Sequence, residues 1–125
     1  MRKINRVKRN EDFQKIIGHK RYVSNDIFVL YYQKGKTDHL RVGISVGKKL
    51  GNAVNRNKIK RQLRMMLTEL TNKTVPIDLI VIVRNKYLNK NYSENRKDLL
   101  LVLKKVKMNE YGILNSKEII DEHIS

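Results

Sequence analysis

The sequence contains no cysteine and no tryptophan, and among its 125 residues it has one proline, two phenylalanines and only 12 acidic residues. The absence of cysteine excludes disulfide bonds, thiolate metal sites and cysteine nucleophiles, and it favours the reducing cytoplasm as the location. No apolar run approaches the roughly 18 residues that a transmembrane helix needs, and aromatic anchors for a membrane surface are scarce. We therefore expect no membrane partner.

The charge of the chain is large, positive and unevenly distributed. The sequence has 28 lysines and arginines, which gives a formal net charge of +16. Residues 1–64 hold 18 of these cations and four acids, whereas residues 65–125 hold ten cations and eight acids. Such an excess indicates a polyanionic partner, and a charge that served only for solubility would not need this asymmetry. The amino-terminal half is therefore expected to contact nucleic acid.

The length fits one domain, and the hydrophobic periodicity predicts an αβββαβα order of elements. The expected elements are a helix at 10–17, strands at 19–24, 27–33 and 40–46, a helix at 53–70, a strand at 77–83, and a last helix that Ser93 caps and whose inner face carries Leu99, Leu100, Leu103 and Val106. Three strands in succession suggest an antiparallel meander. The strand at 77–83 is almost continuously apolar, so it should be central in the sheet.

Residues 48–64 form the most distinctive segment, with seven basic residues and no acid. Residues follow one another at about 100° around a helix. One face of the helix at 53–70 is then polar and cationic, with Asn57, Lys60, Arg61 and Arg64, and the opposite face is apolar, with Ile59, Leu63, Met66 and Leu70. Like charges at this spacing repel one another unless an anion lies across them. The cationic face therefore predicts a binding surface.

The loop before this helix adds a second feature that suits phosphate. Gly51 and Asn52 tolerate positive φ, and the first free amides of the helix point towards an incoming anion. Arg56 and Arg61 can each hold phosphate with two parallel hydrogen bonds, and Asn57 can meet a base edge or a 2′-hydroxyl. An ordinary strand-to-helix turn would explain the Gly-Asn pair alone, but beside the cationic face we interpret it as part of the binding surface.

Several other functions are less compatible with these residues. A metal-dependent nuclease needs converging carboxylates, yet Asp26, Asp38 and Asp78 are dispersed, and His19 and His39 are expected in loops. No nucleophile motif or nucleotide-binding glycine loop is present. A helix-turn-helix DNA binder is disfavoured because the basic helix follows a strand. A small basic ribosomal protein that binds ribosomal RNA remains an alternative, because composition cannot separate it from other RNA-binding proteins.

The run Gly-Asn-Ala-Val-Asn-Arg-Asn-Lys-Ile-Lys-Arg at 51–61, preceded by Val-Gly-Ile-Ser-Val-Gly-Lys-Lys at 42–49, resembles the signature of the bacterial ribonuclease P protein family. Supporting segments lie at 6–13, 28–31 and 78–84. The resemblance implies an α+β fold, an α/β sandwich whose central mixed sheet contains a left-handed βαβ crossover, as in the second domain of a small-subunit ribosomal protein. It places a single domain at 1–108, followed by an acidic extension at 109–125 that could form one frayed helix.

The resemblance also implies the partners and the residues that meet them. The family's partners are the catalytic RNA of ribonuclease P and precursor tRNA, whose 5′ leader is removed by an endonuclease reaction that depends on Mg²⁺ held mainly by the RNA. No protein side chain is expected to be catalytic or to bind a metal, and the protein alone is expected to be monomeric. The implied RNA-binding residues are Lys48, Lys49, Asn52, Arg56, Asn57, Lys58, Lys60, Arg61 and Arg64. The implied lining of the leader-binding cleft is Phe13, Ile17, Tyr22, Phe28 and Tyr31. Phe13 and Phe28 could instead be core residues, and for Phe28 the core is the favoured alternative.

Three positions depart from the family pattern. The usual Arg-Asn-Arg triplet ends in Lys58 here, which keeps the charge but loses the planar guanidinium. Ile17 stands where the family often has an aromatic ring, and Gly47 replaces a common serine.

Overall fold

The computed structural model describes residues 5–7, 10–35, 37–71 and 74–106. Its elements are β1 (Asn5–Arg6), α1 (Asn10–Gly18), β2 (Tyr22–Ser24), β3 (Phe28–Lys34), β4 (Arg41–Val46), the 3-10 helix η1 (Lys48–Leu50), α2 (Ala53–Leu70), β5 (Ile77–Val83), the 3-10 helix η2 (Asn85–Asn89) and α3 (Tyr92–Leu103). The predicted extension at 109–125 lies outside the described residues. No helix within the described ranges is both long enough and apolar enough to cross a membrane.

The predicted bounds of the elements agree best with the structure where the hydrophobic pattern extends over many residues. Helix α2 and strand β5 begin and end at the predicted residues. The predicted cap of α3 was wrong: the side chain of Asn91, not Ser93, accepts a hydrogen bond from the Glu94 amide, and the Glu94 carboxylate accepts one from the Asn91 amide. This reciprocal capping box satisfies two amides that would otherwise lack partners at the helix start. Strand β1 was not predicted, because two residues show no periodicity.

The sheet has five strands in the order β1-β4-β5-β3-β2. Strand β3 pairs antiparallel with β2 and β5, while β4 pairs parallel with β5 and β1. The predicted meander was therefore wrong, because β5 lies between β3 and β4. The position of β5 agrees with the prediction that it is central: apart from Asp78 its side chains are apolar on both faces, and only a strand covered on both sides can bury them.

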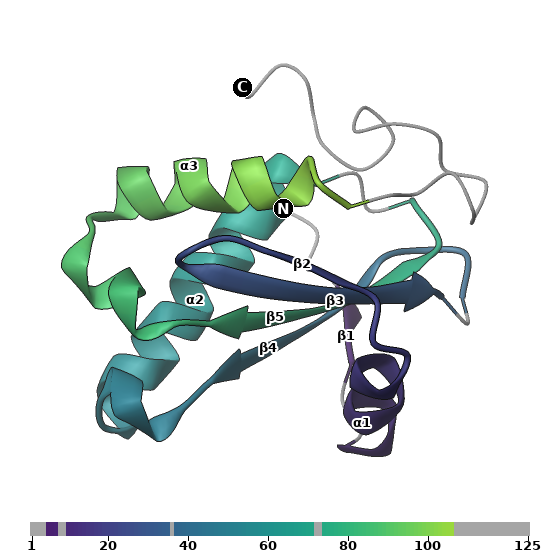
Figure 1. Ribbon diagram of the computed structural model, residues 1–125, viewed down its shortest axis with the longest axis horizontal. Coiled ribbons are helices and arrows are strands. Elements are labelled where there is room, and N and C mark those ends of the chain that lie inside the picture. The colour runs from purple at the N-terminus through teal and green to yellow at the C-terminus, as the bar shows by residue number, and fades with distance from the viewer. Residues whose placement is uncertain (1–4, 8–9, 36, 72–73, 107–125) are drawn as a thin grey trace.

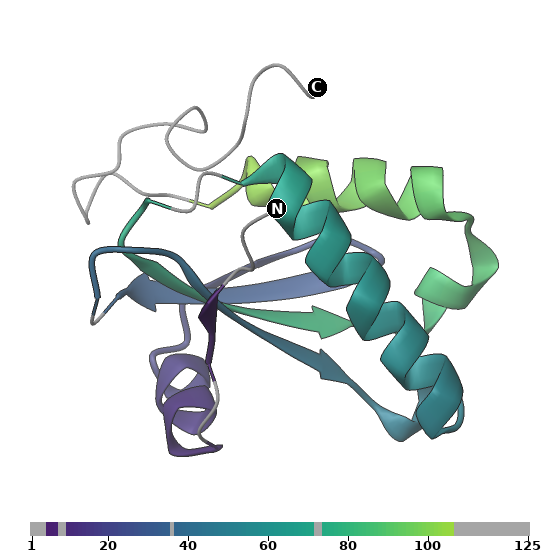
Figure 2. The same cartoon turned by 180° about the vertical axis from the view of Figure 1, so that it is seen from behind.

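Helix α2 connects the parallel strands β4 and β5 with a left-handed crossover. In Figure 2 both strands point to the right, α2 lies in front of the sheet, and β5 lies above β4. Nearly all connections of this type are right-handed, so the topology is unusual and specific. It is the arrangement that the family resemblance implies.

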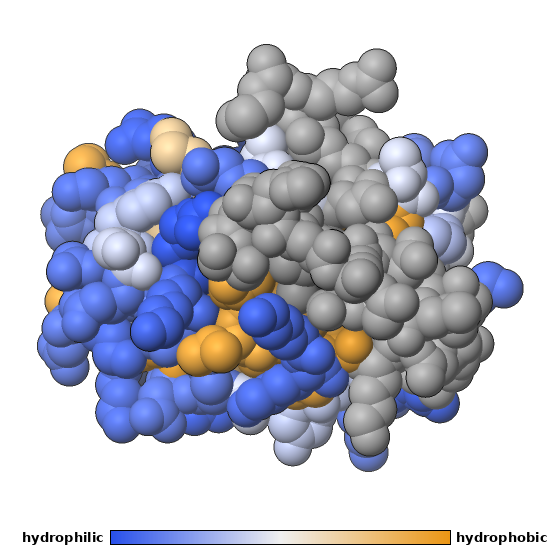
Figure 3. Space-filling model, turned by 90° about the horizontal axis from the view of Figure 1, so that it is seen from above, coloured by the Kyte–Doolittle hydropathy of each residue, from blue (hydrophilic) through white to orange (hydrophobic). Residues whose placement is uncertain are grey.

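The sheet separates two apolar layers (Figure 1). Helices α2 and α3 cover one face with the main core, which includes Phe28, Leu63 and Leu79. Helix α1 covers part of the other face with a small cluster built on Val7, Ile16 and Ile80. From the side of α3 the described surface is mostly hydrophilic, with hydrophobic side chains gathered near its middle (Figure 3). Because α1 has nine residues, it leaves part of its sheet face open.

Candidate RNA interface

Helix α2 has the two faces that its sequence predicts. Its inner residues are at most 4% exposed and pack in the main core: Ile59, Leu63, Met66, Leu67 and Leu70. On the outer side Asn57, Lys58 and Arg61 are exposed, while Lys60 and Arg64 are half-buried. The cations therefore sit on a helix that the core holds in place.

The start of α2 is shaped by a glycine and a side-chain cap. Gly51 has φ of +125°, and a Cβ atom there would lie 3.0 Å from the Cβ of Asn55, so both backbone and space require glycine. The Oδ1 of Asn52 accepts a hydrogen bond of 2.9 Å from the Asn55 amide. Asn52 is thus a structural cap through its oxygen, and only its NH₂ group is left for RNA. Lys48 and Lys49 of η1 are exposed beside this turn.

The seven cations of residues 48–64 are not neutralised by any acid that the structure describes. In the ranges that the structure describes, none of them lies within 4.0 Å of a carboxylate oxygen, whereas acids elsewhere pair with Arg41, Lys86, Lys90 and Arg96. The Nε of Arg56 is buried and has no hydrogen-bond partner there. Unpaired cations and an unsatisfied buried donor are costly in a free protein. An anion placed across the helix would relieve the repulsion between the cations.

Arg6 of β1 belongs to the same surface, although the sequence did not indicate it. Strand β1 pairs with the outer edge of β4 and brings the exposed Arg6 close to Arg64. Burial and the nearby charge of Arg6 lower the pKa of Arg64. We call Arg6, Lys48, Lys49, Asn52, Arg56, Asn57, Lys58, Lys60, Arg61 and Arg64 the basic face. Arg6 could be recognised as part of the basic face only from the pairing of β1, a strand of two residues, with β4.

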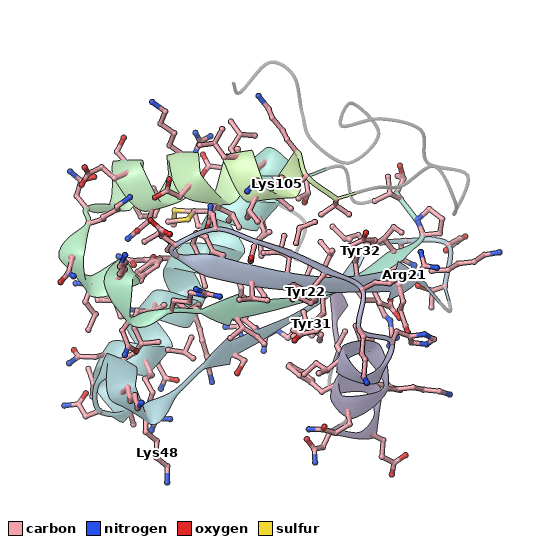
Figure 4. All side chains as sticks on the ribbon, viewed as in Figure 1. Arg21, Tyr22, Tyr31, Tyr32, Lys48 and Lys105 are labelled. Atoms are coloured by element: carbon pink, nitrogen blue, oxygen red, sulfur yellow. The ribbon has the colours of Figure 1, made fainter. Side chains whose placement is uncertain are left out.

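A second surface lies where α1 meets the sheet. Tyr22 and Tyr31 are cross-strand neighbours with ring centroids 5.3 Å apart, and Tyr22 is 56% exposed. Figure 4 shows the two rings together near α1, whereas Lys48 lies well away from them, beyond the end of β4. Phe13 and Ile17 of α1 are half-buried against the same small cluster as Tyr31. We call Phe13, Ile17, Tyr22 and Tyr31 the aromatic strip.

The structure contradicts the placement of Phe28 in this surface. Its side chain is fully buried in the main core, where it meets the ring of Tyr87 edge-on at 6.0 Å. Alternate residues of a strand face opposite sides, so Phe28 and Tyr31 cannot line one surface. Val29 and Ile82, which the sequence did not single out, are opposite each other on the face of Tyr31 and are half-buried. With Ser45 opposite Ile82, they form an open row beside the aromatic strip, towards η1.

The small α1 layer contains a buried ion pair. The guanidinium of Arg41 donates to both carboxylate oxygens of Asp78 at 2.9 and 2.7 Å, and its Nη1 lies 3.7 Å from Oδ2 of Asp12 in α1. The hydrogen bond to Asp78 raises the pKa of Arg41, against the opposing effect of burial. Two residues further along β4, the ring of Phe13 lies over Gly43, where a Cβ atom would be 2.5 Å from the ring. Only glycine allows this close contact.

The described acids are not arranged to hold a metal ion. Asp78 binds Arg41, Asp26 lies 3.9 Å from Lys86, and Asp38 lies 3.1 Å from His39. No group of three or more histidine or acidic side chains within the described ranges could form a metal site. The chemistry that the arrangement supports is binding of an anion along α2 and stacking of flat rings on the aromatic strip.

Comparison with known proteins supports one family. A family model described as ribonuclease P matches residues 1–107. The ribonuclease P protein component of Streptococcus mutans is 45% identical over 119 residues, which cover 95% of this chain and 100% of that protein. The corresponding component of Mycoplasma mycoides is 43% identical over 103 residues, with 81% and 94% of the two chains covered.

Solved structures give the same result. The chain is similar to a Staphylococcus aureus RNase P protein mutant with defective mRNA degradation activity, with a TM-score of 0.73 and 41% identity over 82% of this chain and 87% of that one. It is also similar to the RNase P protein from Thermotoga maritima, with a TM-score of 0.70 and 29% identity over 82% and 97%. These matches do not favour the alternative of a ribosomal protein. The chain therefore belongs to the family of ribonuclease P protein components, the partners of ribonuclease P RNA.

Proposed function

We propose that the basic face binds ribonuclease P RNA and that the aromatic strip binds the single-stranded 5′ leader of precursor tRNA. The proposal that the basic face binds RNA rests on the cations along α2, which have no acidic partner in the described residues. Folded RNA presents phosphates at fixed spacing, and a rigid helix matches them without ordering a flexible chain first. The main core beneath α2 supplies that rigidity.

The aromatic strip suits a leader of any sequence. Every base has a flat face, so stacking on tyrosine or phenylalanine tolerates sequence change. Tyr22 is exposed and Tyr31 is half-buried beside it, which leaves ring surface available to a base. The open row of Val29, Ile82 and Ser45 leads from the strip towards the end of the sheet that carries η1. A leader lying along this row would reach the RNA held by the basic face.

Hydrolysis of the leader bond is assigned to the RNA subunit, not to protein side chains. Magnesium ions held by the RNA would supply an activated water and stabilise the leaving oxygen. The protein contributes cations that hold the RNA and a surface that positions the leader, which lowers the entropic part of the barrier. A cytoplasmic location and a monomeric state of the free protein belong to the same proposal.

Reconstitution tests this function. Added to a bacterial ribonuclease P RNA, the protein is expected to lower the magnesium concentration needed for cleavage of precursor tRNA, because its cations replace part of the ionic atmosphere that the complex otherwise requires. Cleavage is measured across a magnesium titration with and without protein. The same magnesium requirement in both series would rule out the proposal.

Substitution of Tyr31 tests the leader half separately. Tyr31→Ala is expected to weaken binding of precursor tRNA to the holoenzyme by about 1 to 3 kcal/mol, because one stacking surface is lost. Binding of mature tRNA, which has no leader, and of ribonuclease P RNA should stay unchanged. Tyr31→Phe is the matched control and should bind precursor as the original protein does. Equal losses for precursor and mature tRNA would contradict a role in leader binding.

A further inference from the structure

Arg41 joins two carboxylates that come from different layers of the molecule. The Asp78 side chain is 0% exposed in the middle of the sheet, and the Arg41 side chain is 15% exposed beside it. The third member, Asp12, stands in the first turn of α1. A guanidinium that holds one carboxylate in a fork has a fixed plane, so the direction of its remaining N–H groups is fixed as well.

The same turn of α1 carries Phe13, the first member of the aromatic strip. Asp12 and Phe13 are consecutive, and their partners Arg41 and Gly43 are two residues apart on the same face of β4. One turn of helix is thus attached to one strand at two points, by an ion pair and by a ring. Within the described residues α1 also packs on the sheet through the small cluster around Ile16, and apolar contacts of this kind have no direction of their own.

We propose that Arg41 is a positioning residue: it holds α1 through Asp12 so that the ring of Phe13 keeps its place over Gly43 and presents a surface to the leader. The inference rests on the proposed leader-binding function and adds to it the residue that orients the strip. A helix of nine residues is marginal by itself. Its orientation on the sheet must therefore come from tertiary contacts, and the ion pair joins one defined residue of α1 to one defined residue of β4.

Asp12→Ala in the holoenzyme tests this role, because it removes the α1 end of the contact and leaves the buried pair of Arg41 and Asp78 intact. Precursor tRNA is expected to bind about threefold to tenfold more weakly, with unchanged binding of mature tRNA and of ribonuclease P RNA. The direction of the change in precursor affinity distinguishes a positioning effect from a charge effect. Loss of an acid near a polyanion should by itself strengthen binding, so weaker binding has to come from a displaced α1.

Glu11→Ala is the matched control. Glu11 is exposed, neighbours Asp12 in the same turn and carries the same charge. The Glu11→Ala substitution should leave precursor binding unchanged or make it slightly stronger. Asp12→Asn, which keeps the shape of the side chain, should weaken precursor binding as Asp12→Ala does. If Glu11→Ala weakens precursor binding as much as either Asp12 variant, the positioning role is overturned.

A double-mutant cycle shows whether Asp12 acts through Phe13. In a Phe13→Ala background the effect of Asp12→Ala should disappear, since no ring is left to position. Independent, additive effects would overturn the inference. If Tyr31→Ala weakens precursor binding and Asp12→Ala does not, the positioning role fails while leader binding stands. If Phe13→Ala and Tyr31→Ala both leave precursor binding unchanged, leader binding itself fails, and the positioning role fails with it.

Discussion

Raising the salt concentration from about 50 to about 200 mM is expected to weaken association with ribonuclease P RNA by roughly 300-fold to 4,000-fold. If the basic face neutralises about five to seven phosphates, the logarithm of the association constant should fall with the logarithm of salt at a slope of roughly −4 to −6. The reason is structural: the cations of α2 have no acidic partners among the described residues, so each is available to release a counterion. A filter-binding titration measures the slope.

Single substitutions show which residues contribute to this salt dependence. Arg61→Ala and Arg64→Ala should each weaken RNA association and reduce the slope by about 1, with little loss of fold. Arg61 is exposed and Arg64 is half-buried on the outer side of the helix, so neither supports the core. Lys97→Ala, at an exposed position of α3, is the control and should leave the slope unchanged. A slope near zero in the original protein, or unchanged affinity in both arginine variants, would remove the basic face from the proposed function.

Arg41→Ala is expected to lower the free energy of unfolding by about 3 to 5 kcal/mol, because it leaves a fully buried carboxylate without its cation. The Asp78 side chain is 0% exposed and takes both of its short hydrogen bonds from Arg41. Its neighbour across the sheet, Gln33, already has a buried Oε1 atom without a hydrogen-bond partner in the described ranges. Without the guanidinium, two neighbouring buried side chains would have oxygen atoms that lack hydrogen-bond partners among the described residues.

Urea unfolding monitored by circular dichroism measures this effect. Arg61→Ala is the matched control, since it removes the same side chain from an exposed position and should cost less than about 0.5 kcal/mol. Replacing both partners, with Arg41→Met and Asp78→Leu together, should recover a large part of the loss, because no buried charge remains. A loss below about 1 kcal/mol for Arg41→Ala would mean that Asp78 is not held as the structure indicates.

Most local elements and the cationic side of α2 could be predicted from the sequence because both depend on spacing along one helix or strand. Ile59, Leu63, Met66 and Leu70 recur at helical steps, and the same steps place Arg61 and Arg64 on the opposite side. The apolar run of β5 indicated a strand covered on both faces, and the structure places it between β3 and β4. No knowledge of the partner strands was needed for these predictions.

Two of the errors concern contacts between distant parts of the chain, and a third is local. The meander was wrong because neighbouring strands pair by default only when no better partner exists, and β5 is that partner. Phe28 was assigned to the leader surface because its strand was known but the face it buries was not. Asn91 was missed as the cap of α3 because serine and asparagine both cap helices, and only the backbone position of Glu94 shows which residue does so here.

Sequence alone determined that the chain carries a strongly cationic helix face with an apolar face behind it, since helical geometry converts a repeat of residues directly into two sides. Tertiary structure decided which cations meet and which rings share a surface. Arg6 joins the basic face through β1, and Asp12 of α1 pairs with Arg41 of β4. The physical reason is that burial and charge pairing depend on distances between elements, and these distances exist only after the sheet order is chosen.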